Sequence, residues 1–312
     1  MTTPAYPHFH RLQAACEALE PLATAVASPN NLPAFQGALD AARAGLIKPI
    51  LVGQPDRIRE AAAQAGVGPD EFEIVAATDE HDAAARAVRL VHDGRARAVM
   101  KGNLHSDVLL AAVVARDTGL RGERRLSHVF SMDVPGYDRL FHITDGALNI
   151  APDIKTRIDI IHNAGELAIA CGVSRPKIAV MSAVESPTAN IQSSLDAAEL
   201  AAMNATEFPR FDVHGPLAMD NAMCPEAARI KKIDHPVAGH ADVLVVPTIE
   251  AGNMVVKALT FVAGAETAGI VLGARVPVML TSRADSPLAR RMSCVLALLL
   301  EHWQRTGESR LP

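Results

Sequence analysis

The stretch of residues 276–287 reads Val-Pro-Val-Met-Leu-Thr-Ser-Arg-Ala-Asp-Ser-Pro. Its first five residues are apolar, as is typical of a short buried strand, and the run stops at a polar turn. Ser286 suits the N-cap of a helix and Pro287 its first position, ahead of an apolar helix from Leu288 to about Glu301. The stretch therefore predicts a buried strand that passes directly into a helix.

The polar turn of this stretch carries Thr281, Ser282 and Arg283. A helix amino terminus has unpaired N–H groups and a positive dipole, so it favours an anion. Arg283 adds a guanidinium fork suited to phosphate, and the two hydroxyl groups add donors. The alternative is an ordinary turn in which Asp285 neutralises Arg283. The local sequence leaves both interpretations open.

Composition narrows the class of protein. The chain has 312 residues, which favours two domains over one. Hydrophobic residues make up 49% and charged residues 21%, as in globular enzymes and unlike disordered chains. A formal net charge of -5 and an aromatic content of 4% argue against a nucleic-acid-binding protein.

The cysteines and the apolar runs indicate the compartment. The cysteines are far apart and form no CxxC pair: Cys16, Cys171, Cys224 and Cys294. This spacing favours reduced thiols over a disulfide framework or a zinc site. No apolar run has membrane-spanning length, and residues 1–10 lack the order of a signal peptide. We expect a soluble cytoplasmic protein without a metal, and we expect His8, His10, His235 and His240 to be ordinary polar residues.

Apolar runs alternate with helical patterns in the first part of the chain. Strands are expected at 46–52, 73–76 and 96–100, and helices at 12–26, 39–44, 56–65 and 82–92. This alternation predicts an α/β fold with a mainly parallel sheet. Such sheets bind ligands beyond the carboxyl ends of their strands.

Lys101-Gly102 directly follows the expected strand 96–100. Gly102 permits a close backbone approach, and Lys101 offers a mobile charge at the edge of the sheet. The alternative is a solvated lysine beside a turn glycine. We treat both residues as candidate ligands of an anion.

A polar, glycine-containing linker at 119–125 precedes two strand candidates, 126–134 and 139–145, joined through Pro135-Gly136-Tyr137. Pro-Gly between strands predicts a hairpin. We therefore place one α/β/α domain at residues 1–124 plus 275–312 and the other at 125–274. In the second domain Asp153 is expected to cap a long helix that reaches Cys171.

Common nucleotide and hydrolase motifs are missing. The sequence has no GxGxxG, GxxxxGK, GxSxG or HExxH motif. Asp220 and Asn221 stand at the start of an expected helix, either as capping residues or as ligands. Gly252 and Asn253 stand in the same position in the next helix.

The strand ends, read together, resemble the phosphate acetyltransferase/phosphate butyryltransferase family, with the butyryltransferase side favoured. The matching motifs run in family order over nearly the whole chain: Met-Lys-Gly at 100–102, Leu-Ser-His-Val at 126–129, Val-Pro-Gly-Tyr-Asp-Arg-Leu at 134–140, Thr-Asp-Gly-Ala-Leu-Asn-Ile-Ala-Pro at 144–152, Gly-Pro-Leu-Ala-Met-Asp-Asn-Ala at 215–222, Val-Ala-Gly-His-Ala-Asp at 237–242, Ile-Glu-Ala-Gly-Asn at 249–253 and Pro-Val-Met-Leu-Thr-Ser-Arg-Ala-Asp-Ser at 277–286.

The resemblance implies two α/β/α domains with a cleft between them, akin to isopropylmalate dehydrogenase, and a homodimer. It implies reversible transfer of a short acyl group, acetyl or butyryl, between coenzyme A and phosphate, directly within a ternary complex. Coenzyme A is then a substrate, with no tightly bound cofactor. The implied roles are phosphate binding by Arg283, a hydrogen bond from Ser282, and contacts to phosphate, acyl group or coenzyme A from Lys101, Gly102, Thr281, Asp220, Asn221, Gly252 and Asn253.

Two departures from the family pattern stand out. Phosphate acetyltransferases carry an aspartate, proposed as the base, a turn beyond the Ser-Arg pair, where this chain has Ala289; Asp285 is the remaining candidate. They also carry an arginine where this chain has Leu110 and Ala111. The alternatives are a catalytically silent coenzyme A- or phosphate-binding regulatory protein and a metal- and NAD-dependent dehydrogenase of the same fold.

Overall fold

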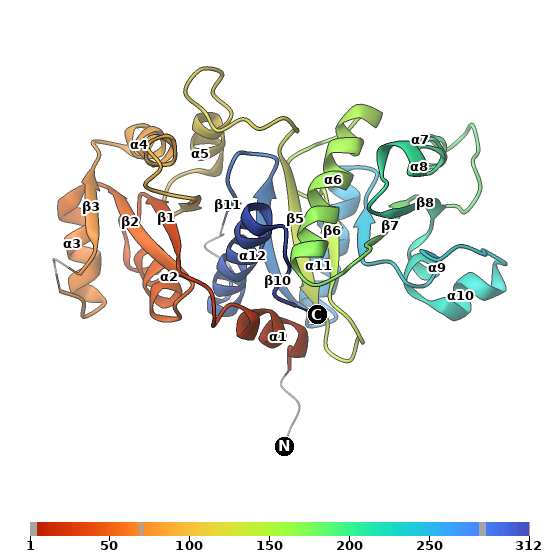
Figure 1. Cartoon of the computed structure of the whole chain (residues 1–312), viewed down its shortest axis with the longest axis horizontal. Helices are drawn as coiled ribbons and strands as arrows, with labels where there is room; N and C mark the ends of the chain where they lie inside the picture. Colours follow the sequence, from red (N-terminus) through yellow and green to blue (C-terminus); the bar gives the residue numbers. More distant parts are fainter. Residues whose placement is uncertain (1–4, 69–70, 281–284, 312) are drawn as a thin grey trace. The chain divides into compact units, whose positions relative to one another are not determined.

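The computed structural model describes residues 5–68, 71–280 and 285–311, and these form a mixed α/β fold, as predicted (Figure 1). The chain divides into two compact units. Arg11–Arg124 and Ala268–Glu308 form what we call the N-terminal unit; Met1–His10, Arg125–Thr267 and Ser309–Pro312 form the central unit. The sequence placed the second boundary at 274/275 instead. Whether the units are independently folding domains stays a prediction.

The N-terminal unit contains strands in the order β3-β2-β1-β4-β11-β10. Their bounds are β1 Leu22–Ala27, β2 Ile47–Gly53, β3 Glu73–Ala76, β4 Ala98–Lys101, β10 Glu266–Leu272, which enters this unit at Ala268, and β11 Val278–Met279. The first four strands and β11 pair in parallel, whereas β10 pairs antiparallel with β11 and an isolated antiparallel bridge joins Arg121 to Ala274. The prediction of a mainly parallel sheet is confirmed.

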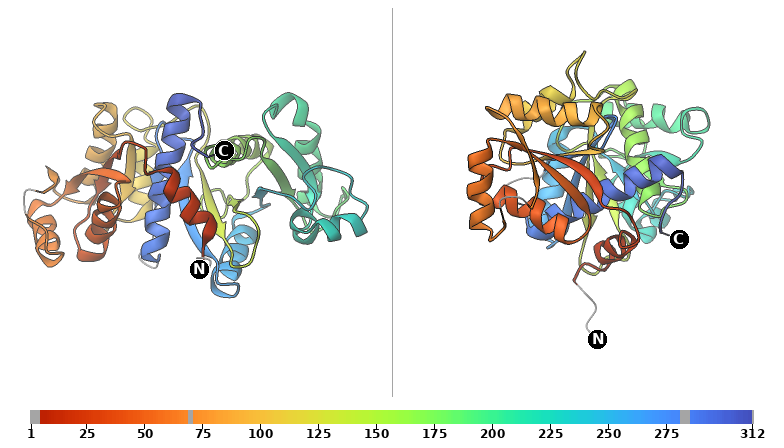
Figure 2. Two further views of the ribbon diagram at one scale, coloured as in Figure 1. Left: turned by 60° about the horizontal axis from the view of Figure 1, so that its bottom comes forward. Right: turned by 60° about the vertical axis from the view of Figure 1, so that its left-hand side comes forward.

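Helices cover both faces of this sheet (Figure 1 and Figure 2). One group packs together as α2 Leu32–Arg43, α3 Pro55–Gln64 and α12 Pro287–Thr306; the other pairs α4 Glu80–His92 with α5 Ser106–Val113. Right-handed crossovers explain the division, because the chain steps outward from β1 to β3 and then returns to β4. Since β11 pairs with β4 and α12 packs on α2, the final elements join the N-terminal unit, as expected.

The expected helix at 12–26 is wrong in its second half. Helix α1 (Pro7–Ala15) ends early, and Leu22–Ala27 is strand β1. Pro21 cannot continue a helix, and the alanines that suggested one pack equally well in a strand whose side chains are almost all buried. Pro33 lies in the first turn of the next helix, α2, whose N-cap Asn31 accepts a hydrogen bond from the amide of Ala34.

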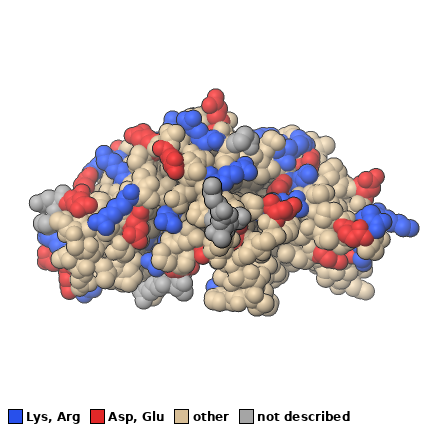
Figure 3. Space-filling model, turned by 90° about the horizontal axis from the view of Figure 1, so that it is seen from below, with Lys and Arg blue, Asp and Glu red and all other residues tan. Residues whose placement is uncertain are grey.

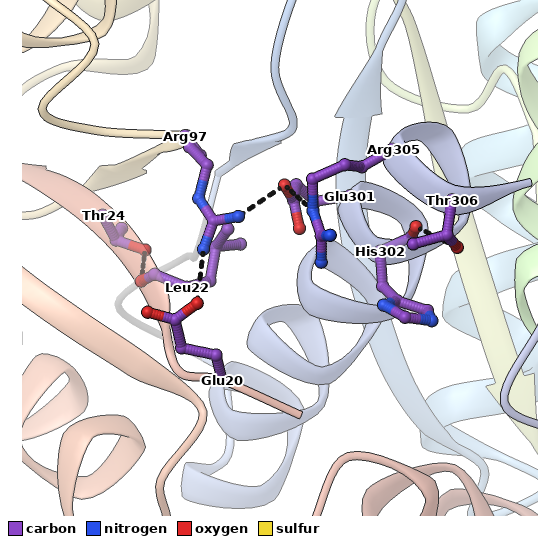
Figure 4. A network of polar contacts seen from close by, with 8 residues as sticks. All are labelled: Glu20, Leu22, Thr24, Arg97, Glu301, His302, Arg305 and Thr306. Carbon is purple, nitrogen blue, oxygen red and sulfur yellow. Dashed lines mark hydrogen bonds and ion pairs between the residues drawn. The ribbon is translucent and has the colours of Figure 1, made fainter. Parts of the chain in front are cut away.

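An ion-pair network ties α12 to the amino-terminal side of this sheet (Figure 4). The Arg97 guanidinium lies 2.9 Å from Glu301 and 3.9 Å from Glu20, and Arg305 lies 3.3 Å from Glu301. Glu301 is 12% exposed, so this network is less screened by water than the isolated surface pairs. The network fixes the carboxyl half of α12, the helix that follows residues 281–284 in the sequence.

The central unit contains strands in the order β5-β6-β9-β7-β8. Their bounds are β5 Ser127–Asp133, β6 Phe141–Thr144, β7 Lys177–Met181, β8 Asp212–Leu217 and β9 Val243–Val245. The predicted hairpin is confirmed, because β5 and β6 pair antiparallel around Gly136, which has a φ of +80°. Strands β6, β9, β7 and β8 pair in parallel, so their carboxyl ends share one edge.

Helices flank the strands of the central unit as well. They are α6 Ile154–Ala170, α7 Gln192–Ala202, α8 Asn204–Glu207, α9 Met219–Met223, α10 Pro225–Ile230 and α11 Ile249–Phe261. The expected capping of α6 is confirmed: Asp153 accepts a hydrogen bond from the Thr156 amide at 2.8 Å, and the helix ends before Cys171. Among the described helices of the chain, none is long and apolar enough to cross a membrane.

We predict that Gly165→Ala, on α6, destabilises the protein. An added Cβ would lie 2.6–2.9 Å from three ring carbons of Phe211, whose side chain is 1% exposed and cannot move aside. Overpacking of this kind costs about 1–3 kcal/mol, more than the roughly 1 kcal/mol that alanine gains in helix propensity. Thermal unfolding should show a lower midpoint, whereas the control Gly68→Ala, where the Cβ meets open space, should not. Equal midpoints for both variants would contradict this packing.

Candidate active site

The carboxyl edge of the N-terminal unit brings together the chain ends that the sequence singled out. In the parallel register Ala27 of β1 lies opposite Lys101 of β4, and Met100 lies opposite Met279 of β11. Lys101-Gly102 and the exit from β11 therefore belong to one edge of one sheet. The predicted catalytic residues Ser282 and Arg283, and the predicted ligand Thr281, lie outside the described residues.

Both flanks of the 281–284 segment match the prediction. Strand β11 precedes the segment and helix α12 follows it. Ser286 is the N-cap of α12, and its hydroxyl accepts a hydrogen bond from the Ala289 amide at 2.9 Å. Pro287 lies in the first turn of the helix. The helix runs to Thr306, beyond the expected end. Arg290 fixes its start by donating to the carbonyl oxygens of Asp285 and Pro33.

Lys101 and Gly102 are both buried, so Lys101 is not the solvated surface residue of the alternative interpretation. The Lys101 side chain is held at the edge, with Nζ 3.5 Å from the carbonyl oxygen of Gly102. A Cβ on Gly102 would lie 2.5 Å from the carbonyl oxygen of Ala27 and 2.6 Å from that of Ser28. The close approach that Gly102 allows is therefore an approach of β1 and β4 to each other.

At the carboxyl edge of the central unit, Asp220 and Asn221 differ in burial. Asp220 is exposed on α9, whereas Asn221 is fully buried and donates a hydrogen bond to Glu185 at 3.1 Å. Glu185 also pairs with Lys231 at 2.9 Å, which lowers the pKa of Glu185 and raises the pKa of Lys231. The sequence prediction missed this ion pair, although Glu185 follows β7 as the other candidates follow their strands.

Gly252 ends the first turn of α11, beyond the end of β9, and Asn253 follows it. A Cβ on Gly252 would lie 2.8 Å from Cα of Gly146, so the glycine lets α11 pack against the loop after β6. That loop is held by Asp145, whose carboxylate accepts the amide hydrogens of Ala147 and Leu148 at 3.0 and 2.9 Å. Gly252 therefore has a packing role, while Asn253 is exposed.

Two buried histidines belong to the hairpin strands of the same unit, His128 to β5 and His142 to β6. His142 shares a 2.8 Å hydrogen bond with Ser131, and its burial lowers its pKa to about 4. Burial likewise lowers the pKa of His128 to about 4, partly opposed by the negative charge of Asp145. Both imidazoles are therefore neutral at pH 7.

Two other features lie away from these edges. A cavity of about 680 Å³ in the N-terminal unit lies between α4 and residues 112–118 and is lined by none of the predicted site residues. Its arginines Arg86 and Arg89 pair with Asp82 and Asp93 of the same helix.

Across the described part of the chain, no group of at least three His, Cys, Asp or Glu residues could hold a metal ion. On the face shown in Figure 3, acidic and basic side chains are interspersed.

Comparison with known proteins identifies the family. The model of the phosphate acetyl/butaryl transferase family matches residues 76–289. The chain is 48% identical to a phosphate acetyltransferase of Rhizobium meliloti over 98% of this chain and 97% of that protein. It is 39% identical to a phosphate butyryltransferase of Clostridium acetobutylicum, over 88% and 92% of the two chains. The chain belongs to the phosphate acetyl/butyryltransferase family.

Solved structures agree with this assignment. A branched-chain phosphotransacylase from Enterococcus faecalis V583 matches with a TM-score of 0.79 and 32% identity, over 90% of this chain and 99% of that chain. A 4-hydroxythreonine-4-phosphate dehydrogenase from Burkholderia phymatum matches with a TM-score of 0.52 and 14% identity, a likeness of fold alone. Of the two relatives above, the acetyltransferase is the more similar, so these identities do not favour the butyryltransferase side.

The residues at the start of α12 bear on which group could act as the base. Ala289, at the position where phosphate acetyltransferases were expected to carry an aspartate, is 5% exposed and packs inward. The backbone carbonyl of Asp285 accepts hydrogen bonds from Arg290, so this residue helps to fix the start of the helix. The carboxylate of Asp285 as the base stays a prediction.

We predict that the protein loses stability as the pH falls from 6.5 to 4. The pKa values of His128 and His142 are about 4 in the folded protein, against 6.5 when unfolded, so the unfolded chain binds more protons throughout that window. By linkage each histidine costs about 2 kcal/mol at pH 5 relative to pH 7. Urea unfolding at pH 7, 6 and 5 should show the decline, and His142→Gln should show a shallower one. Constant stability over this range would contradict the buried neutral state.

Proposed function

We propose that this protein transfers a short acyl group between coenzyme A and inorganic phosphate, by direct attack of one substrate on the other in a ternary complex. Membership of the phosphate acetyl/butyryltransferase family makes it a transferase. The observation that carries the reaction is the 48% identity to a phosphate acetyltransferase over nearly the whole of both chains. Direct transfer needs no nucleophile from the enzyme, because holding both substrates in the reacting geometry supplies much of the acceleration.

The proposed phosphate-binding group comprises Arg283, Ser282, Thr281, Lys101 and Gly102. Arg283 binds phosphate and the negative charge that develops during transfer, and Ser282 donates a hydrogen bond at the reacting sulfur or the acyl oxygen. Three observations support this role: the parallel pairing of β11 with β4, the buried Lys101 at the end of β4, and the capped start of α12. A helix amino terminus and a buried ammonium both favour an anion nearby.

For the central unit we infer that Asp220, Asn221 and Asn253 contact a substrate. Each follows the carboxyl end of a parallel strand, as ligands of such sheets do. Gly252 contributes through its packing against Gly146, which sets the position of the first turn of α11. The isopropylmalate dehydrogenase-like arrangement of two domains with a cleft stays a prediction from the resemblance.

Coenzyme A is a substrate in this proposal and no tightly bound cofactor takes part. We place the enzyme in the cytoplasm. None of the four cysteines, all in the described part of the chain, forms a disulfide, and burial raises the pKa of Cys16 and Cys294 to about 12. Unbridged cysteines are typical of a reducing compartment.

We also propose a homodimer that uses α11. Met254, Phe261 and Val262 are 65%, 77% and 86% exposed, and the spacing of Met254, Ala258 and Phe261 places them on one face of the helix. An apolar face left in water favours association, and a two-fold axis would pair the same face of two copies. Charged residues are sparse there, with Lys257 lying 5.6 Å from the centre of the Phe261 ring.

The reaction is tested by phosphate-dependent release of free thiol from acyl-CoA substrates from acetyl to hexanoyl. We predict activity with phosphate in the wild type and a loss of about 10²–10³-fold in kcat for Arg283→Ala, since a preorganised donor to developing charge contributes that much. The phosphate KM should also rise, with the fold intact by circular dichroism. The control Arg305→Ala, at the far end of the same helix, should keep full activity.

Three results would contradict the proposal. Turnover that requires NAD and a metal ion would make the protein a dehydrogenase. Tight binding of acyl-CoA without turnover would make it a silent binding protein. Unchanged kinetics in Arg283→Ala would remove this residue from the mechanism.

The dimer is tested separately by light scattering after size exclusion. Phe261→Glu places a charge on the proposed apolar interface, so it should shift the protein from dimer to monomer at micromolar concentrations. Ile230→Glu, a matched change at a 65% exposed apolar residue of α10, should leave the mass unchanged. A monomeric wild type, or a dimer that survives Phe261→Glu, would overturn the assignment of α11.

A further inference from the structure

Ser28, directly after strand β1, is buried but incompletely hydrogen-bonded. Its side chain is 1% exposed, and its hydroxyl oxygen has no hydrogen-bond partner among the described residues. Its φ is +55°, in the left-handed region that serine rarely occupies. A buried unsatisfied hydroxyl and a left-handed serine each cost free energy, and such features cluster at functional sites.

The backbone of Ser28, in contrast, is fully used. Its amide donates to the carbonyl oxygen of Val52 at 2.7 Å, and its carbonyl oxygen accepts the amide of Asn103 at 2.7 Å. The amide of Gly102, which precedes Asn103, donates to the carbonyl oxygen of Ala27 at 2.8 Å. Ser28 therefore lies between the ends of β2 and β4, next to Lys101-Gly102, and within the described part of the chain its hydroxyl is the polar group that lacks a partner.

A second unsatisfied atom lies two residues further along the chain. The side-chain oxygen of Asn30 is buried and finds no donor within the described residues. It lies 2.6 Å from the place that a Cβ of Gly53 would take, so the glycine at the end of β2 leaves room for it. The same loop thus leaves one hydroxyl and one acceptor unsatisfied at the carboxyl ends of parallel strands.

We propose that Ser28 is a phosphate-binding residue of this enzyme, which rests on the acyltransferase function proposed above. Its hydroxyl donates a hydrogen bond to a phosphate oxygen beside the positive charge of Lys101. The side-chain oxygen of Asn30, in the same loop, accepts a hydrogen bond from the hydroxyl group that a hydrogen phosphate ion still carries. Sulfate, which is fully ionised at neutral pH, offers no such proton and should bind more weakly.

The test measures separate KM values for phosphate and for acyl-CoA in Ser28→Ala. A hydrogen bond to a charged ligand accounts for about tenfold or more in affinity, so the KM for phosphate should rise by at least that factor. The KM for acyl-CoA should stay unchanged. The midpoint of thermal unfolding should stay equal or rise, because the variant removes a buried hydroxyl that has no partner among the described residues.

A second variant and a control test this interpretation. Ser28→Gly also removes the hydroxyl while relieving the left-handed backbone, so it should show the same rise in the KM for phosphate with a higher thermal midpoint. Thr24→Val is the control on the same strand. Its hydroxyl is satisfied by the carbonyl of Leu22 at 2.8 Å (Figure 4), so the change should lower stability and leave both KM values unchanged.

The outcomes separate this inference from the function on which it rests. A wild type without phosphate-dependent activity would reject the acyltransferase proposal itself. An active wild type with an unchanged KM for phosphate in Ser28→Ala and Ser28→Gly would overturn the assignment of Ser28 alone. A rise confined to the KM for acyl-CoA would overturn it too, because Ser28 would then contact the other substrate.

Discussion

The backbone of Gly102 packs directly against the carbonyl groups of Ala27 and Ser28. The arrangement of the strand ends at the carboxyl edge of the N-terminal unit depends on this contact. Any side chain at 102 would meet those oxygens at 2.5–2.6 Å and push β1 away from β4. The contact lies one residue beyond the parallel pair Ala27 and Lys101. On the other side of β4, strand β11 pairs in the same direction. Three segments distant in sequence thereby end at one edge, as binding by parallel sheets requires.

Both units combine satisfied and unsatisfied polar groups near their carboxyl edges. In the central unit Asn221 donates to Glu185, Glu185 pairs with Lys231, and Asp145 accepts backbone amides, but the side-chain oxygen of Asn221 has no partner among the described residues. In the N-terminal unit the hydroxyl of Ser28 and the amide oxygen of Asn30 have none among the described residues. Because burial without a hydrogen bond costs free energy, a ligand that bonds to these two atoms would be favoured there.

Local signals in the sequence were sufficient for the strand and helix that flank 281–284, for the hairpin at Gly136 and for the cap at Asp153. Each depends on turn chemistry or apolar spacing within a few residues. Strand β1 was missed because its alanines suit a helix, and only pairing with β2 and β4 makes it a strand. That error concealed Ser28 as a strand-end residue. The packing of Gly252 on Gly146 and the burial of Asn221 were also invisible, since both follow from contacts between distant segments.

The central claim is that phosphate binds at the carboxyl edge formed by β1 and β4. Hydrogen–deuterium exchange of the intact protein, with and without inorganic phosphate, tests it most directly. Bound phosphate stabilises the segments that contact it, so the account predicts slower exchange in peptides covering residues 27–31 and 101–105. Unchanged exchange in both peptides at a phosphate concentration that supports turnover would contradict it.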